Sequence, residues 1–204
     1  MNTRMLVFAK APLPGQAKTR LVPTLGAKGA ARLAHAMLNT TLAHALAAGL
    51  GPVELCMSPA PAHPDWRACR LPAGVVQRDQ GEGDLGARMA RAARRGLARN
   101  GAVLLVGTDC PQLSPALLHQ AATRLTDCDA LLYPTRDGGY ALLGLRRFSA
   151  TLFEHMPWST DRVAELTRRR LTALGWCWRE GETLLDIDEP GDLFQLPGSW
   201  VTPC

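Results

Sequence analysis

Carboxylates and cations occur in three segments where they could act together on a phosphate group. Asp109 lies three residues after the run 102–106, an unbroken series of Ala, Val and Leu that is typical of a strand buried on both faces. Asp188 lies near the other end of the sequence, and Lys18 and Arg20 follow the first apolar run. Ligands of open α/β sheets bind beyond the carboxyl ends of the strands, so we expect these side chains to meet at one sheet edge. Two carboxylates there would bind Mg²⁺ with water and substrate phosphates, and the metal and cations would stabilise a departing diphosphate without a protein nucleophile.

The loop Lys10–Leu21 is the candidate phosphate cradle. Two prolines and a glycine make it stiff and exclude a helix or a central strand. The GxxxxGK[ST] spacing of a Walker A loop is missing, and a basic loop that is merely exposed to solvent is the alternative interpretation. The candidate phosphate-binding residues of this loop are Lys10, Gly15, Lys18 and Arg20.

The segment Gln80–Gly86 contains a GxGxxG motif before a predicted helix, and this spacing matches the sequence fingerprint of dinucleotide-binding sites. The preceding apolar run is short and is not the first strand, and Glu82 and Asp84 would repel a pyrophosphate. Asp84 is better explained as a helix N-cap. We therefore expect Gly83 and Asp84 to contribute to nucleotide binding at a nucleobase or sugar.

The segment Thr135–Tyr140 is predicted to be a Gly-rich turn between two strands. Its two glycines, Gly138 and Gly139, permit positive φ angles. Asp137 is either a site residue or an ordinary turn-former.

The candidate residues need a framework of alternating strands and helices, which the apolar pattern supplies. That alternation predicts an α/β fold with a largely parallel sheet covered by helices. The predicted strands are 4–9, 53–57, 75–77, 102–106, 130–134, 141–145 and 176–179, and the predicted helices are 26–48, 85–97, a helix from 115 to about 125 and one from about 161 to 174.

The net charge of +5 raises the question of a nucleic-acid ligand. The predicted helix 85–97 carries an apolar stripe that leaves its arginines on solvated faces, and no aromatic residues interleave with them as a stacking platform would require. We expect neither a nucleic-acid nor a membrane partner. The stripe is Leu85, Met89, Ala93 and Leu97, and the arginines are Arg88, Arg91, Arg94, Arg95 and Arg99.

The six cysteines form no CxxC pair and have no disulfide or zinc spacing, so we expect reduced thiols. Cys110 adjoins Asp109, and a neighbouring carboxylate raises the pKa of a thiol, so packing explains Cys110 better than covalent catalysis. The apolar run Met5–Ala9 is too short for the core of a signal peptide, and we expect a cytoplasmic protein.

Six motifs follow one another between about residues 4 and 194. They are Phe8-Ala-Lys-Ala-Pro-x-Pro-Gly-x-x-Lys-Thr-Arg-Leu21, Gly83-Asp-Leu-Gly86, Gly107-Thr-Asp-Cys-Pro111, Asp137-Gly-Gly-Tyr140, Pro157-Trp158 and Asp186-x-Asp-x-Pro-x-Asp-Leu193. This pattern closely resembles a bacterial family of radical-SAM/selenodomain-associated transferases, which are provisionally assigned as glycosyltransferases, some of them in arsenosugar biosynthesis.

The resemblance implies a single three-layer, Rossmann-like domain over residues 1–204, with a mostly parallel mixed sheet of the nucleotide-diphospho-sugar transferase (glycosyltransferase A) type. A more distant resemblance, to 2-phospholactate and molybdenum-cofactor guanylyltransferases, implies that Lys18 and Arg20 grip a triphosphate and that Asp109 binds the metal. Asp188 looks like the second metal ligand, and Asp186 is the substitute candidate.

We therefore expect a Mg²⁺- or Mn²⁺-dependent transferase, most simply a glycosyltransferase that uses a nucleotide-activated donor and a small-molecule acceptor. The alternative is a guanylyl- or cytidylyl-type nucleotidyltransferase that releases pyrophosphate, because residues 107–111 hold one Asp where many glycosyltransferases of this fold carry Asp-x-Asp. A non-catalytic nucleotide- or nucleic-acid-binding module is a third hypothesis. The expected catalytic residues are Lys18, Arg20, Asp109 and Asp137, and the expected acceptor-binding residues are Gly138, Gly139, Tyr140 and Trp158.

Overall fold

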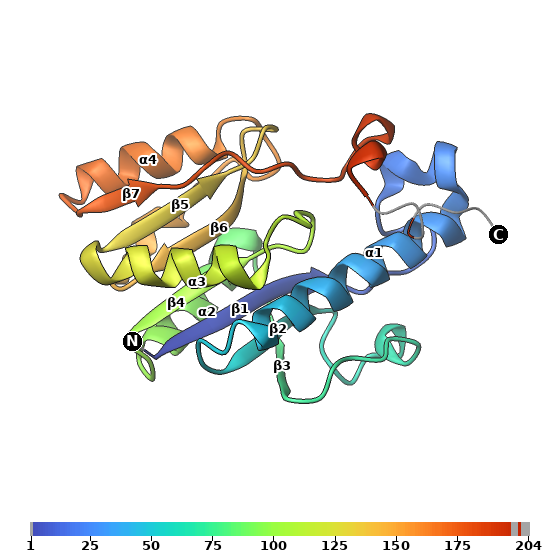
Figure 1. Cartoon of the computed structure of the whole chain (residues 1–204), viewed down its shortest axis with the longest axis horizontal. Coiled ribbons are helices and arrows are strands. Elements are labelled where there is room, and N and C mark those ends of the chain that lie inside the picture. Colours follow the sequence, from blue (N-terminus) through green and yellow to red (C-terminus); the bar gives the residue numbers. More distant parts are fainter. Residues whose placement is uncertain (1, 197–199, 201–204) are drawn as a thin grey trace.

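The computed structural model describes residues 2–196 and 200, and it contains a seven-stranded mixed sheet with helices on both faces (Figure 1). The strand order is β3-β2-β1-β4-β6-β5-β7, and β6 runs antiparallel to both of its neighbours while the other pairs are parallel. The predicted α/β fold with a mostly parallel sheet is confirmed. The strands are β1 (Thr3–Lys10), β2 (Val53–Ser58), β3 (Val75–Asp79), β4 (Ala102–Val106), β5 (Ala130–Pro134), β6 (Tyr140–Leu145) and β7 (Trp178–Glu180).

Helices α1 (Val22–Ala47) and α3 (Pro115–Arg124) cover one face of the sheet, and α2 (Leu85–Leu97) and α4 (Val163–Ala173) cover the other. The central strands are apolar throughout because their residues alternate between the two cores. In β4, Leu104 packs toward α1 and α3, and Leu105 packs toward α2 and α4. None of the helices in the described ranges is both long enough and apolar enough to cross a bilayer.

Helix α1 begins four residues earlier than its predicted start at Gly26. Pro23 lies in its first turn, where the missing backbone N–H costs nothing, and Gly26 then breaks the helical geometry with a φ of 69°. The result is a short helical turn, a kink and the main helix.

Two expectations about α2 are wrong. Leu85 is 40% exposed rather than part of the buried stripe, because it is the first helical residue and lies beyond the edge of the sheet. Arg95 is not on a solvated face: its guanidinium pairs with the Glu54 carboxylate, which is 2% exposed and also accepts a hydrogen bond from Arg4. A buried carboxylate in β2 requires such cations, and α2 supplies one of them.

Candidate active site

The structure brings Asp109, Asp188 and Lys18 together at the carboxyl edge of the sheet. The Lys18 Nζ lies 2.5 Å from Asp109 Oδ1 and donates to Asp188 Oδ1 at 2.8 Å. It also donates to the backbone oxygen of Ile187 at 2.6 Å. These three contacts match the three N–H bonds of an ammonium group. Lys18 therefore bridges the two carboxylates.

Packing and hydrogen bonds bring the sequence-distant Asp188 to this edge. The backbone N–H of Ile187 donates to the backbone oxygen of Asp109 at 2.9 Å, which joins the two acidic segments directly. Ile187 is also fully buried in a small core with Leu21 and Leu193, beside the start of α1. Asp192 accepts hydrogen bonds from the backbone N–H of Asp188 and thereby fixes its orientation.

Lys18 is held in an unusual conformation. Its backbone is left-handed, with φ 48° and ψ 47°, which a residue with a Cβ adopts only at some cost in free energy. Its side chain is 6% exposed. Burial alone would lower the pKa of Lys18, but the charges and hydrogen bonds of Asp109 and Asp188 outweigh it and raise the pKa above its ordinary value. Lys18 therefore stays charged, and its charge is balanced by the carboxylates of Asp109 and Asp188.

Asp137 lies across the site in the turn between β5 and β6. Its Oδ1 accepts hydrogen bonds from Thr135 Oγ1 at 2.5 Å and from the backbone N–H of Gly139 at 2.9 Å. Of the two glycines that permit a positive φ, Gly138 adopts one, with a φ of 86°, and Gly139 does not. A Cβ on Gly138 would collide with the backbone of Asp161, so glycine is required where the turn packs against the segment before α4.

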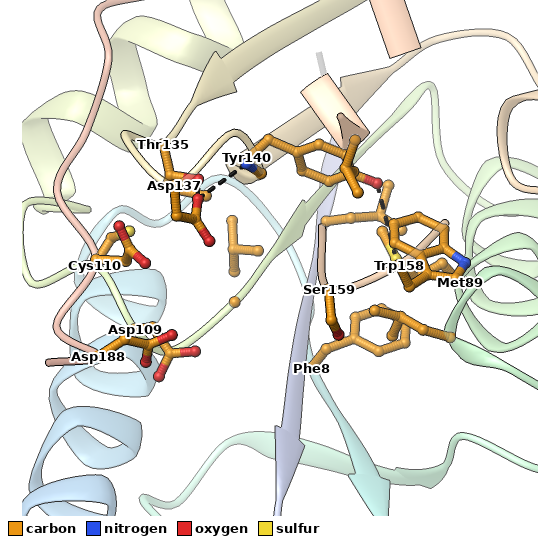
Figure 2. Close-up of a pocket in the computed structure, with 18 of the residues that line it drawn as sticks. Phe8, Met89, Asp109, Cys110, Thr135, Asp137, Tyr140, Trp158, Ser159 and Asp188 are labelled. Carbon is orange, nitrogen blue, oxygen red and sulfur yellow. Dashed lines mark hydrogen bonds between the residues drawn. The ribbon is translucent and has the colours of Figure 1, made fainter. Parts of the chain in front are cut away.

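A cavity of about 220 Å³ connects these residues to an aromatic wall. Figure 2 shows the carboxylates of Asp109, Asp137 and Asp188 on one side, with Phe8, Met89, Tyr140 and Trp158 on the other. The rings of Tyr140 and Trp158 meet edge to face, with centroids 6.4 Å apart. The cavity therefore has an acidic end and an apolar end.

The acidic end contains a carboxyl group with a perturbed pKa. Burial, followed by the charges of Asp137 and Asp188, raises the pKa of Asp186 to about 6. Asp186 lines the cavity but does not contact Lys18, whereas Asp188 does. Burial also raises the pKa of the Cys110 thiol, with smaller contributions from nearby carboxylates, and this thiol has little thiolate character.

Several predicted residues lie outside this cluster. The side chain of Arg20 is 69% exposed, and its nearest carboxylate oxygen, on Glu189, is 3.9 Å away. Lys10 and Gly15 are also exposed on the same loop. Asp84 caps α2 as predicted by accepting a hydrogen bond from the backbone N–H of Ala87 at 2.8 Å.

Gly83 is not among the residues that line the cavity, whereas Leu85, two residues further along the chain, is. The loop that contains Gly83 is held by arginines of α2: Arg88 donates to the Gly83 oxygen at 2.8 Å, and Arg91 donates to the Glu82 oxygen at 2.9 Å. These arginines order the loop.

Sequence reasoning missed part of the cavity lining. Leu85 and Met89 belong to a helical stripe that predicts core packing. Met89 is buried in the core as the stripe predicts and also lines the cavity, whereas Leu85, the first residue of α2, is 40% exposed. The remaining missed residues come from four segments, and no spacing in the sequence links them. They are Phe8, Leu105, Val106, Gly107, Cys110, Thr135, Ala141, Ser159, Thr160 and Val163.

The comparisons with known proteins agree with this architecture. The family described as "Uncharacterized protein conserved in bacteria (DUF2064)" matches residues 41–160. The chain belongs to the DUF2064 family. No curated protein matches this family member in sequence.

Solved structures relate this DUF2064 chain to nucleotide-using transferases. A protein from Desulfovibrio desulfuricans G20, provisionally named a nucleotide-diphospho-sugar transferase, shares 28% identity with a TM-score of 0.86, over 94% of this chain and 84% of that one. The 2-C-methyl-D-erythritol 4-phosphate cytidylyltransferase of Thermus thermophilus shares 18% identity with a TM-score of 0.55, over 96% and 97%. Rv0371c from Mycobacterium tuberculosis H37Rv, in complex with manganese, shares 20% identity with a TM-score of 0.54, over 96% and 98%. The last two matches show the shared fold.

Proposed function

We propose that the protein is a divalent-metal-dependent transferase that uses a nucleotide-activated donor, and that it transfers a sugar to a small-molecule acceptor. The observation that carries this proposal is the Lys18 ammonium held between Asp109 and Asp188 at the carboxyl edge of the sheet. Two carboxylates that hold one cation between them can hold a metal ion in the same way, and the positive charge of that metal would stabilise the donor's diphosphate. The fold shared with nucleotide-diphospho-sugar transferases supports the same assignment.

The two carboxylates fit Mg²⁺ or Mn²⁺. Both Oδ1 atoms lie within hydrogen-bonding distance of one nitrogen atom, so a small cation in its place could contact both. The described residues contain no group of three or more His, Cys, Asp or Glu side chains that could enclose a metal. This donor set suits Mg²⁺, which usually keeps several waters and binds one or two carboxylates together with substrate phosphates. When bound, the metal would supply charge stabilisation to the departing diphosphate.

Lys18 then has two roles. In the structure it neutralises Asp109 and Asp188, and with donor bound it would contact the diphosphate. Its long, flexible side chain permits both contacts from a fixed, left-handed backbone. Arg20, Lys10 and Gly15 stay candidates for the distal phosphates, and Gly83 and Asp84 for the nucleoside.

The acceptor is assigned to the cavity. The free carboxylate oxygen of Asp137 would orient an acceptor hydroxyl, and Gly139, Tyr140 and Trp158 form the walls. Gly138 acts by holding the turn against the segment that carries Trp158. Asp186 lines the acidic end and is the substitute metal ligand.

A second candidate function is nucleotidyl transfer. It is favoured by the single Asp at residues 107–111 and by the fold shared with cytidylyltransferases. In that reaction an acceptor oxygen attacks the α-phosphate of a nucleoside triphosphate, the bond to the β-phosphate breaks, and pyrophosphate leaves.

Product analysis separates the two reactions. The protein would be incubated with Mg²⁺, a small-molecule cell extract as the acceptor source, and either nucleotide sugars or nucleoside triphosphates. Release of nucleoside diphosphate from a nucleotide sugar is expected. Release of pyrophosphate from a triphosphate would instead establish nucleotidyl transfer, and release of neither product with Mg²⁺ or Mn²⁺ would contradict the transferase proposal.

A further inference from the structure

The charges around the cavity define what it can hold. Its lining contains four carboxylates, and in the described part of the chain none of the lining residues is Lys, Arg or His. Lys18 is turned toward Asp109 and Asp188 and adds no free positive charge to the cavity. A phosphate or carboxylate group placed here would face four carboxylates, and Lys18, the cation beside them, is already paired with two of them. The lining carboxylates are Asp109, Asp137, Asp186 and Asp188.

The acidic end of the cavity offers a free hydrogen-bond acceptor on Asp137. Asp137 Oδ1 accepts two hydrogen bonds from the turn, and within residues 2–196 and 200 its Oδ2 accepts none. An ionised carboxylate has lone pairs on both oxygens, so Oδ2 can accept a hydrogen bond from a hydroxyl group. A hydroxyl donor is therefore matched to this end of the cavity.

The opposite end is apolar and aromatic. Phe8, Met89, Tyr140 and Trp158 line it, and Figure 2 shows their side chains facing the carboxylates across the cavity. Leu85 extends this wall at the rim, which explains why a large apolar side chain at the start of α2 is 40% exposed. Such a wall packs against the C–H surface of a ring.

The size of the cavity suits a single ring. Its volume of about 220 Å³ exceeds the roughly 150 Å³ that accommodates benzene in an apolar protein cavity. From charge, hydrogen bonding and size together, we infer that the cavity binds one uncharged ring that carries hydroxyl groups, and that it rejects phosphorylated rings. The inference deepens the proposed transferase function, since this ring would be the acceptor or the transferred group.

The test compares two probes that differ only in a phosphate group: benzyl alcohol and benzyl phosphate. Binding to the whole protein would be measured by NMR saturation transfer in buffer without divalent metal or nucleotide, so that no metal can capture the phosphate. Benzyl alcohol should bind saturably, and benzyl phosphate should bind more weakly by about tenfold or more, because its charges enter an acidic site of reduced dielectric. Equal or tighter binding of benzyl phosphate, or no saturable binding of benzyl alcohol, would overturn the inference.

Variants at Leu85 locate the binding and keep the test independent of folding defects. Leu85→Ala should weaken benzyl alcohol binding by about three- to tenfold through lost apolar contact. Val76→Ala is the matched control, because Val76 is also 40% exposed but lies on β3, outside the cavity lining. Leu85→Arg should strengthen benzyl phosphate binding by placing a cation at the rim. No effect of Leu85→Ala, with Val76→Ala also silent, would show that the probe binds elsewhere and would overturn the assignment.

The outcome is separable from that of the proposed function. If benzyl alcohol binds as expected and no nucleotide-sugar or triphosphate turnover is found, the cavity assignment stands and the transferase proposal fails. If turnover is found and the probes bind contrary to expectation, only the cavity assignment fails.

Discussion

Replacing Lys18 by methionine removes the ammonium from between Asp109 and Asp188 and keeps a side chain of similar length. Removing one partner of a buried ion pair costs about 3–5 kcal/mol of stability. Here the Lys18 side chain is 6% exposed, but the two carboxylate side chains are 49% and 38% exposed, and water can solvate them after the change. We therefore expect Lys18→Met to lower the free energy of unfolding by about 1–3 kcal/mol in metal-free buffer.

Lys18→Met should also bind metal more tightly. The wild-type protein must break the contacts of Lys18 with Asp109 and Asp188 before these carboxylates can bind a metal, and the variant does not bear that cost in free energy. At 1.4 kcal/mol per factor of ten, the dissociation constant for Mn²⁺ should fall by about five- to hundredfold in Lys18→Met. The measurement is a titration of free Mn²⁺ by electron paramagnetic resonance, with Lys28→Met, which changes an exposed lysine of α1, as the matched control. Adding Asp109→Asn to Lys18→Met should remove the gain. Unchanged or weaker Mn²⁺ binding in Lys18→Met would refute the competition between Lys18 and the metal.

Three further predictions concern other parts of the molecule. Glu54→Gln should lower the free energy of unfolding by about 2–4 kcal/mol, because the carboxylate is 2% exposed and pairs with two arginines; a urea midpoint equal to that of the wild type would count against this pairing. The pKa of Asp186 is raised by burial from 3.8 to about 6, so its contribution to stability is present below pH 3.8 and is lost as the pH rises to about 6. Asp186→Asn should therefore be more stable than the wild type by about 1 kcal/mol at pH 8, a value reduced for the partial exposure of Asp186, and should show no gain in stability near pH 3. Thermal unfolding at the two pH values measures this difference. A difference in stability that does not depend on pH would exclude titration of Asp186 as the cause. Cys110 should react with Ellman's reagent far more slowly than the exposed Cys177, because burial raises the pKa of its thiol; faster labelling of Cys110, read by mass spectrometry, would reopen covalent catalysis.

Local signals in the sequence predicted much of the fold. The unbroken apolar run at β4 indicates a strand covered on both faces. Ser114 is a residue type that favours helix N-caps, and it caps α3 by accepting a hydrogen bond from the backbone N–H of Leu117. The pairing of Arg95 with Glu54 was not predicted, because it depends on the rotation of α2 relative to β2. Helical periodicity fixes which residues share a face, but not which polar residue on another element that face meets.

The candidate site was predictable in its composition and less so in its geometry. The carboxyl ends of parallel strands share one edge, so a meeting of Asp109 with the loop after β1 followed from topology. The bridging position of Lys18 did not follow, since it depends on a left-handed backbone and on the docking of Ile187 against Leu21. Tyr140 and Trp158 of the aromatic wall were expected at the site from the family resemblance, whereas Phe8 and Met89 were not, because each lies in an apolar segment that predicts core packing.

The central claim is a metal-dependent diphosphate site at Asp109 and Asp188, and thermal unfolding with nucleoside diphosphates tests it most directly. ADP, GDP, CDP and UDP would each be added with and without Mg²⁺, to the wild type and to Asp109→Asn. A ligand at about 100 times its dissociation constant adds roughly 2.7 kcal/mol, or about 5–10 °C in unfolding temperature for a chain of this size. We expect at least one diphosphate to stabilise the wild type in this range only when Mg²⁺ is present, and Asp109→Asn to lose that gain while keeping its own unfolding transition. Stabilisation of equal size without Mg²⁺ or in Asp109→Asn, or none with any of the four diphosphates, would contradict the claim.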